Sequence, residues 1–514
     1  RHPPPLPHQL TGTVLGTLRG MRESGENTRE HARVHAIVIG GSIAGLCAAR
    51  VLSDSFSRVT VYERDELPST PANRATVPQD QHLHLLMARG AAEFESLFPG
   101  LLDGMVAAGV PILENRPDCI YLGAAGHVLG TGHTLRDEFT AYVPSRPHLE
   151  WQLRTRVQDI ANVKIVRRSV AEPRFDPARQ RVTGVLLAPE NGGEQEFIPA
   201  DLVVDAAGRG TRLPVWLEKW GYERPVEQTI DIGINYATHR MRIPEGLIAE
   251  KVVVEGASHD QSLGLGMLFY EDRAWVLTTF GVADAKPPRT FPEMLALAGQ
   301  LLPAHFSAAL AKAEPFGEPA YHAFPASKWR RYDKLDRFPG GIVPLGDAVA
   351  SFNPTFGQGM TMTSLQAGHL KWALQFPDHQ LAAVLNGATA RTTYPVWMMN
   401  GIADVAFHHA VSKQHVPWWW RPSAALFDQF LGAAETEAVL AEWFLRRFSL
   451  LDSLYMVPPP RIVGHAIRHN MRLWLRERRE AAKYRRAGRG DRERGEAGES
   501  GAPASARVTA LQSP

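Results

Sequence analysis

The chain has 514 residues, with 56 lysines and arginines against 54 acidic residues, and a net charge of +2. This length can bury a large core and form two or more structural regions, whereas the small net charge gives no signature of nucleic-acid binding. The only two cysteines, Cys47 and Cys119, exclude a disulfide framework and make the cytoplasm the expected compartment. No run of about 18 apolar residues occurs, so we expect no membrane-spanning segment.

Residues 1–32 are expected to form an appendage outside the fold. They begin with a Pro- and His-rich stretch, and a charged stretch follows the first methionine, Met21.

Residues 34–64 have the pattern of a strand, a turn, a helix and a second strand. A mostly apolar run ends at residue 39, the turn Gly-Gly-Ser-Ile-Ala-Gly follows, and apolar residues at helical spacing lead into a second β-branched run. The first glycine permits a sharp turn, the last lets the helix pack close to the sheet, and the amides at the helix start face a pyrophosphate. An acid ending the second strand can hold a ribose hydroxyl. This pattern predicts a dinucleotide-binding unit whose cofactor contacts are Gly40, Gly41, Ser42, Ile43, Ala44, Gly45, Glu63 and Arg64.

Ser42 stands where G-x-G-x-x-G has its middle glycine. Serine is small and brings a hydroxyl, so we expect the substitution to be tolerated. A glycine-rich turn of another α/β fold is the alternative interpretation.

The next segment contains a proline-punctuated loop and two expected helices. Arg74 is the cation of this loop best placed to reach the cofactor, and a solvated loop arginine is the alternative. One helix is expected near residues 84–98. The residues 142–157 predict a second, amphipathic helix with Arg146 at its start and one apolar face. His82 and His84 are two apart, which is poor spacing for a metal site, and we predict no metal.

Two further segments repeat the pattern of an apolar strand that ends in small residues. The first ends at residues 205–208 and brings Gly208 to the expected cofactor edge of the sheet. The second delivers Gly346 and Asp347, and a loop with little side-chain bulk then opens another helix. From this loop we expect cofactor contacts by Pro354, Gly357, Gln358, Gly359 and Met360.

Between these segments, residues 230–281 alternate apolar and polar side chains. Tight turns join the alternating runs, which indicates antiparallel strands with one buried face. We interpret them as a substrate domain inserted into the dinucleotide fold. Its hydrophobic residues are expected to shape an apolar pocket.

The residues 378–479 are helical and aromatic in pattern. Trp418, Trp419 and Trp420 form either a core cluster or a membrane-interface patch, and we favour the core. The helix after Pro460 is basic and amphipathic, so it could lie on an anionic membrane, although packing on its own protein is favoured. The tail 480–514 is expected to be disordered, because its charged and Gly/Ala/Ser-rich composition buries too little apolar surface.

Taken in order, these elements resemble the FAD-dependent aromatic-hydroxylase-like monooxygenases, the flavoproteins related to para-hydroxybenzoate hydroxylase and squalene epoxidase. The resemblance covers residues 34–375. The phrases VPQDQHLHLLMARG, SRPHLEWQL, DLVVDAAGRGTRLP, SKWRRYDKL and GDAVASFNPTFGQGM are most similar to the actinobacterial branch with polyether polyketide epoxidases.

The resemblance implies an α/β fold with a glutathione-reductase-type, Rossmann-like FAD domain, an inserted antiparallel substrate domain and a helical C-terminal region. The expected FAD domain comprises residues 33–80, 140–228 and 336–377, and the substrate domain comprises 81–139 and 229–335. Gly40, Ser42 and Gly45 would hold the pyrophosphate, Glu63 the adenosine ribose, Arg146 the phosphate or ribityl region and Asp347 the ribityl chain. Val170 completes the expected contacts.

The implied reaction is NAD(P)H-dependent transfer of one oxygen atom from a C4a-hydroperoxyflavin to a hydrophobic secondary metabolite, with epoxidation favoured over ring hydroxylation. NADH or NADPH would visit transiently, since no second glycine-rich βαβ unit occurs. No side chain stands out as catalytic: His82, His84, Tyr236 and Tyr270 are the polar candidates. The alternatives are a reductase of isoprenoid double bonds and a flavin-binding interaction protein without turnover. A halogenase is disfavoured, because no W-x-W-x-I-P sequence occurs.

Overall fold

The computed structural model describes residues 33–74, 76–114, 119–132, 140–189, 193–258, 260–404, 417–455 and 457–499. The expected appendage, residues 1–32, lies outside this part of the chain. A parallel sheet with strand order β17-β11-β1-β2-β7 forms the centre of the fold. Its strands are β1 (His35–Ile39), β2 (Arg58–Glu63), β7 (Val163–Arg167), β11 (Leu202–Asp205) and β17 (Ile342–Pro344). The predicted strand–turn–helix–strand unit is therefore confirmed.

Helices cover one face of this sheet and bury a continuous apolar core against it. The helix expected near residues 142–157 is confirmed, with Leu149, Leu153 and Val157 fully buried, although much of its polar side is buried as well. The helix begins at Arg146, where Ser145 caps it by accepting a hydrogen bond from the His148 amide. The helices on this face are α2 (Ile43–Ser53), α3 (Ala88–Leu97), α4 (Leu101–Ala107), α5 (Arg146–Gln158) and α9 (Gly359–Ala373).

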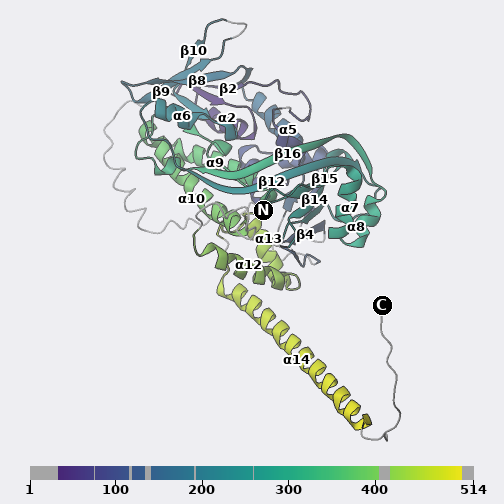
Figure 1. Ribbon diagram of the computed structural model, residues 1–514. Coiled ribbons are helices and arrows are strands. Elements are labelled where there is room, and N and C mark those ends of the chain that lie inside the picture. The colour runs from purple at the N-terminus through teal and green to yellow at the C-terminus, as the bar shows by residue number, and fades with distance from the viewer. Residues whose placement is uncertain are drawn as a thin grey trace, which may run out of the picture.

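A three-stranded antiparallel sheet, β10-β9-β8, covers the opposite face together with α6 (Leu213–Lys219). Its strands are β8 (Val170–Asp176), β9 (Arg181–Leu187) and β10 (Glu196–Pro199). The result is a Rossmann-like layered α/β unit with helices on one side and a small sheet on the other (Figure 1).

The alternating segment forms part of an eight-stranded sheet, in the order β18-β16-β12-β15-β14-β13-β4-β5. The expected antiparallel pairing over residues 230–281 is confirmed, while β13 pairs in parallel with β4. Helices α7 (Phe291–Leu301) and α8 (Ala304–Leu310) pack on one face of this sheet. The strands are β4 (Ile120–Ala124), β5 (His127–Val128), β12 (Glu227–Arg242), β13 (Val252–Glu255), β14 (Leu263–Phe269), β15 (Trp275–Gly281), β16 (Glu314–Arg330) and β18 (Ala350–Ser351), and a separate pair is formed by β3 (Ile112–Glu114) and β6 (Thr140–Tyr142).

The C-terminal part is helical, as expected, with α10 (Asp378–Asp404), α12 (Trp420–Ala434), α13 (Ala438–Phe448) and α14 (Pro460–Glu499). The three tryptophans do not form one core cluster. Trp420 is buried against Gly401, whereas the side chain of Trp418 is 85% exposed. The interpretation as a core cluster is therefore wrong for Trp418, which lies in the turn before α12, whereas Trp419 is partly buried and packs against the same core as Trp420.

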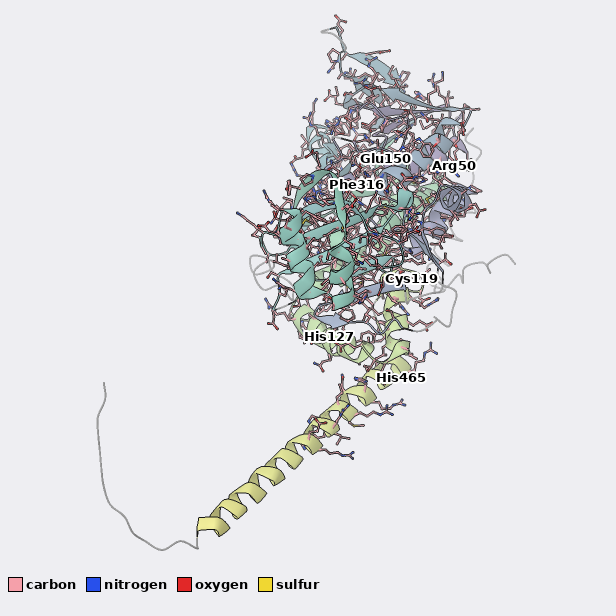
Figure 2. The ribbon with its side chains drawn as sticks, turned by 90° about the vertical axis from the view of Figure 1, so that its right-hand side faces the viewer. Arg50, Cys119, His127, Glu150, Phe316 and His465 are labelled. Atoms are coloured by element: carbon pink, nitrogen blue, oxygen red, sulfur yellow. The ribbon has the colours of Figure 1, made fainter. Side chains whose placement is uncertain are left out.

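Helix α14 extends away from the body and continues to Glu499 (Figures 1 and 2). The disorder expected from residue 480 is thus wrong for residues 480–499, while 500–514 lie outside the described chain. Glu, Arg and Ala make up most of this stretch and favour a helix, whereas its four glycines disfavour one. Arg476 and Glu480 form an ion pair one turn apart that supports the helix.

The contacts between α14 and the body that we identify come from its first turns. Ile462 is buried, His469 faces Glu437, and the Asn470 amide donates to the Gln429 carbonyl.

Deleting residues 481–514 should therefore leave the melting temperature essentially unchanged in a thermal scan. Ile462→Ala should lower stability by about 2–4 kcal/mol, because it removes buried aliphatic volume. A large loss on truncation would show that the distal helix stabilises the fold.

Candidate functional site

The glycine turn between β1 and α2 has the geometry expected for a dinucleotide cradle. Gly40 has φ +101°, which disfavours other residues, and its amide donates to the Tyr62 carbonyl at 2.9 Å. A Cβ at Gly45 would lie only 1.8 Å from the Gly40 carbonyl oxygen. These glycines therefore allow the helix to start against the strand, with its first-turn amides directed out of the turn.

Glu63 is positioned by this turn and by a buried arginine. Its Oε2 accepts from the Gly41 amide at 2.8 Å and forms an ion pair with Arg74 at 3.0 Å, and its Oε1 accepts from the Asp65 amide. Arg74 also pairs with Asp65 and with Glu150 at 2.8 Å. The alternative that Arg74 is a solvated loop residue is thus wrong, because three carboxylates hold it in the interior.

Arg146 lies on the other side of the same carboxylate network. It pairs with Asp80, donates to Ser42 Oγ at 2.9 Å and lies 3.5 Å from Glu150. The Ser42 hydroxyl donates in turn to Glu150 Oε2 at 3.0 Å. Burial, with the nearby charge of Glu150, raises the pKa of the Asp80 carboxyl to about 6 against the opposing effect of Arg146.

Sequence reasoning missed Glu150, which joins both arginines to the glycine turn. It is labelled in Figure 2. Its position four residues after Arg146 places both side chains on one face of α5, and this spacing was the available signal. What the sequence could not show is that Arg74, from a loop far away in sequence, completes the network.

Asp347 lies beside the cavity on the turn after β17. Within the described residues its carboxylate accepts no hydrogen bond, and burial raises its pKa although Arg209, Arg146 and Arg330 oppose the shift. Arg330 fixes the backbone of this turn by donating to the carbonyls of Asp347 and Ala348, both at 3.2 Å. Arg330 therefore fixes the turn, and the Asp347 carboxylate at the cavity wall is left free to accept hydrogen bonds.

Gly346 is required by packing, because its φ is +68° and a Cβ would lie 2.7 Å from that of Ala44. The loop that follows contains a short helical turn, η7 (Pro354–Phe356), and Gly357 with φ +65°. Gln358 does not point at the cavity: it accepts from Asn400 and donates to the Phe448 carbonyl. This side chain anchors the C-terminal helices, which leaves only the backbone of Gln358 for the predicted cofactor contact.

Asp205 is a structural residue of the neighbouring turn. Its carboxylate is fully buried and accepts from the Ala207 amide and the Thr211 hydroxyl. Gly208, with φ +72°, lies at the cavity wall.

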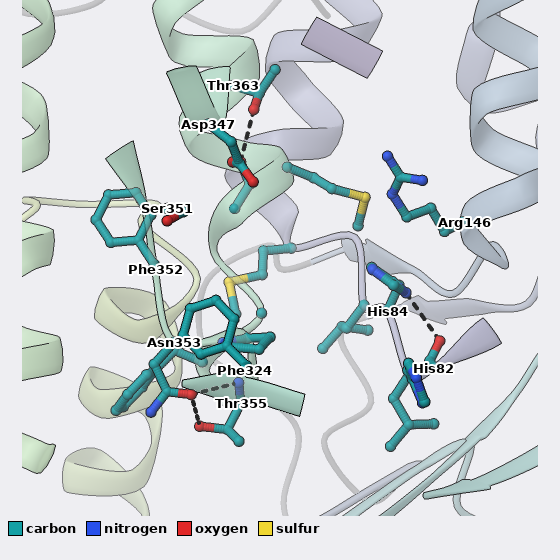
Figure 3. Close-up of a pocket in the computed structure, with 18 of the residues that line it drawn as sticks. His82, His84, Arg146, Phe324, Asp347, Ser351, Phe352, Asn353, Thr355 and Thr363 are labelled. Carbon is teal, nitrogen blue, oxygen red and sulfur yellow. Dashed lines mark hydrogen bonds between the residues drawn. The ribbon is translucent and has the colours of Figure 1, made fainter. Parts of the chain in front are cut away.

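One continuous cavity of about 1110 Å³ runs along these elements. Figure 3 shows Arg146, His84 and His82 along one side of it, with Asp347, Phe352 and Asn353 along the other. The expected site residues that line it are Gly40, Ser42, Ile43, Ala44, Glu63, Arg64, Arg74, Arg146, Val170, Gly208, Asp347, Pro354, Gly357, Gly359 and Met360. The remaining four, Gly41, Gly45, Gly346 and Gln358, lie behind this wall.

The other half of the cavity is mainly apolar and lies between the large sheet and the C-terminal helices. Leu122, Val254 and Phe280 line it from the sheet, as expected for the substrate domain. Phe427 and Phe444, from α12 and α13, line it as well. The helical pattern of these segments gave no sign that they would contribute to the pocket.

Two of the four polar candidates project unpaired atoms into the interior. His82 Nε2 and Tyr236 Oη are buried and have no hydrogen-bond partner among the described residues. The rings of His82, Tyr236 and His322 lie 5.5–6.4 Å apart, and Thr238 holds His82 Nδ1 at 2.7 Å. Burial lowers the pKa of His82 to about 4 and raises that of Tyr236, so both side chains are neutral at pH 7.

The other two candidates support the backbone. The Tyr270 hydroxyl accepts from the His84 amide and donates to the His84 carbonyl, and the His84 ring contacts the His82 carbonyl. The helix expected near residues 84–98 begins only at Ala88, so His84 lies in the extended segment before it. Tyr270 therefore fixes this segment against the sheet.

Sequence reasoning also missed Asp404, which lines the cavity at the end of α10. Its Oδ1 accepts from Asn353 Nδ2 at 2.9 Å, and its Oδ2 is buried without a partner among the described residues. Burial raises the pKa of this carboxyl to about 7. Asp404 raises the pKa of Tyr236 in turn, so two distant segments share one polar region.

Comparison with known proteins identifies one near relative and a common fold. The Mycobacterium Rv3254 C-terminal domain family matches residues 414–480. The chain is 75% identical over 452 residues to Protein Rv3254 of Mycobacterium tuberculosis, a match that covers 86% of this chain and 95% of that protein. The solved structure of the flavin-dependent brominase Bmp2 is 14% identical and has a TM-score of 0.57, covering 85% of this chain and all of its own (100%).

PqsL, described as a probable FAD-dependent monooxygenase from Pseudomonas aeruginosa, is 16% identical and has a TM-score of 0.51. This match covers 74% of this chain and 99% of PqsL. At such identities the two solved structures establish the fold.

Gly45→Ala should destabilise the protein by about 3 kcal/mol or more, because the new Cβ collides with the Gly40 carbonyl. Gly299→Ala is the matched control, since it lies inside α7 with its nearest atom 3.8 Å from the added Cβ. This control should stabilise its helix by up to about 1 kcal/mol. Thermal scans of both variants test the prediction, and equal melting temperatures would contradict it.

Asp404 should make the fold less stable as pH rises. Its folded pKa of about 7 lies above the ordinary value of 3.8, so folding takes up a proton between pH 3.8 and about 7 and stability is lost as pH rises through this window. Asp404→Asn stays neutral and keeps an acceptor for Asn353. The wild type should lose stability between pH 3.8 and about 7, whereas the variant should not. The melting temperature of the variant minus that of the wild type should therefore grow over this range and level off above it. The free-energy change should not exceed about 1.4 kcal/mol per pH unit, since one proton is involved.

A difference in melting temperature that does not change with pH would show that Asp404 is already ionised in the folded protein throughout this range.

Proposed function

The chain belongs to the family of Protein Rv3254, and we propose that it is an FAD-dependent monooxygenase acting on a hydrophobic molecule. The observation that carries this proposal is the single cavity, which joins a dinucleotide cradle to an apolar chamber. A cofactor held in the cradle would therefore meet a substrate held in the chamber. The fold shared with Bmp2, a flavin-dependent brominase, and with PqsL supports the proposal.

The residues of the cradle fit FAD. The first-turn amides of α2 suit a pyrophosphate, and Glu63 Oε1 retains acceptor capacity for a ribose hydroxyl, since it accepts only from the Asp65 amide. The unpaired Asp347 carboxylate suits the hydroxyls of a ribityl chain. Arg146 and Arg74 place two positive charges beside the glycine turn, partly offset by the carboxylates that hold them.

Bound FAD would accept two electrons from NADH or NADPH. It would then supply the chemistry that transfers one oxygen atom from O₂ to the substrate. The chain's own residues hold and enclose the reactants. The apolar walls from the large sheet, α12 and α13 exclude water from the substrate. Tyr236 Oη can donate to a polar group of the substrate, and His82 Nε2 can bind the same group or a second one.

Among monooxygenase reactions, we propose epoxidation of an alkene ahead of hydroxylation of a ring. The resemblance to polyether epoxidases and the aliphatic and aromatic walls support this choice. A reductase of isoprenoid double bonds would use the same cradle without consuming oxygen. The likeness in fold to a brominase suggests halide oxidation as a further reaction. The sequence contains no W-x-W-x-I-P motif, so we do not favour it.

The decisive experiment is an oxygen-uptake assay on purified protein that shows a flavin spectrum. NADH or NADPH is supplied with a panel of apolar polyenes and phenols, and products are analysed by mass spectrometry under ¹⁸O₂. Substrate-dependent uptake and a product containing one labelled oxygen atom are expected. Anaerobic double-bond reduction would support the reductase, a brominated product in the presence of bromide would support the halogenase, and bound flavin without any turnover would support an interaction protein.

Asp347→Ala should weaken FAD binding roughly tenfold to a hundredfold, because it removes a charged acceptor worth about 1.5–3 kcal/mol. The exposed Asp336→Ala is the control and should retain its flavin. Dialysis followed by absorbance measures the bound fraction of each variant. Full flavin retention by the Asp347 variant would contradict the assignment.

A further inference from the structure

Helix α14 carries an apolar stripe that no other part of the described chain covers. Ile467, Met471 and Trp474 are 61%, 54% and 49% exposed. Their spacing of four and three residues places them on one face of the helix. A solitary helix gains nothing from such a stripe in water, so this face is suited to a partner.

The stripe is directed away from the body of the protein. Ile462 and His469, which contact the body, lie on the other side of the helix, and Asn470, which donates to the Gln429 carbonyl, lies at one edge of the stripe. Figure 2 shows the helix leaving the body near His465, with its exposed side chains in open space.

A row of positive charges flanks the stripe. Arg461, Arg468, Arg472 and Arg479 are exposed and, at 100° per residue, fall along one border of the apolar face. The guanidinium of Arg478 lies 4.0 Å from the ring centroid of Trp474, which brings a further charge onto the stripe itself.

We propose that α14 docks on an anionic phospholipid surface. An amphipathic helix with aromatic and aliphatic residues on one face and arginines beside them lies in the plane of such a surface, with the apolar side chains below the headgroups. No helix of the described chain is long and apolar enough to span a membrane, which fits binding at the surface. A second copy of α14 is a poorer partner, because arginines bordering the seam of both helices would repel each other.

Further apolar residues are exposed on or next to elements that neighbour α14. Trp418 and Leu426, at 85% and 72% exposure, precede or lie on α12, which packs against α14. Val457, at 70% exposure, also lines the cavity. If the proposed function holds, docking brings the cavity wall at Val457 close to the lipid and gives an apolar substrate a path that avoids water. The docking itself does not depend on that function.

Co-sedimentation with vesicles tests the proposal on the full chain. Vesicles of phosphatidylcholine with phosphatidylglycerol are compared with vesicles of phosphatidylcholine alone. The first variant replaces Ile467, Met471 and Trp474 by Ser, and the second replaces Arg468, Arg472 and Arg479 by Gln. The control variant replaces Phe197 and Val226, exposed apolar residues far from α14 in the sequence, by Ser.

We expect the wild-type and control proteins to bind anionic vesicles, more weakly at high salt, and both α14 variants to lose at least tenfold in affinity with unchanged melting temperatures. Absence of binding to anionic vesicles, or equal binding to both vesicle types, would overturn the proposal. So would a wild-type dimer, seen by light scattering without lipid, that the serine variant abolishes, because a second copy would then cover the stripe.

Discussion

The close contact between the Gly40 carbonyl and Gly45 sets the position of almost everything at the site. Because no side chain separates the turn from the helix, α2 starts directly at the end of β1. The missing side chain of Gly41 leaves room for Glu63, at the end of the neighbouring strand, to accept from the Gly41 amide. Gly346, from a third strand, closes against Ala44 in the same manner. Three strand ends thus converge within the reach of one ligand.

Charge compensation is the second condition of this site. Burying Arg74 and Arg146 would be costly without partners, and Glu150 contacts both while also accepting from Ser42. The serine that replaces the usual middle glycine thereby becomes part of the network. Its hydroxyl is a polar link between the turn and α5, beyond being a small residue that the turn tolerates.

The C-terminal helices line the cavity, as the large sheet does. Gln358 ties the loop before α9 to Asn400 and to the Phe448 carbonyl, and Asn353 ties the same loop to Asp404. The bond to Phe448 attaches the region matched by the Rv3254 C-terminal domain, residues 414–480, to this loop, whereas Asn400 and Asp404 belong to α10. A change in either part would therefore alter the shape of the cavity.

The sequence by itself determined the parallel sheet, its glycine turns and most of the residues along the cradle. These features depend on short-range patterns: strand periodicity, glycine at turns, and an acid at a strand end. Tertiary structure alone decided which polar groups are paired, because Arg74, Glu150 and Asp404 meet their partners from segments far apart in the chain. It also decided which face of each helix is covered. Periodicity gave α14 an apolar stripe, but only its extension away from the body left that stripe exposed.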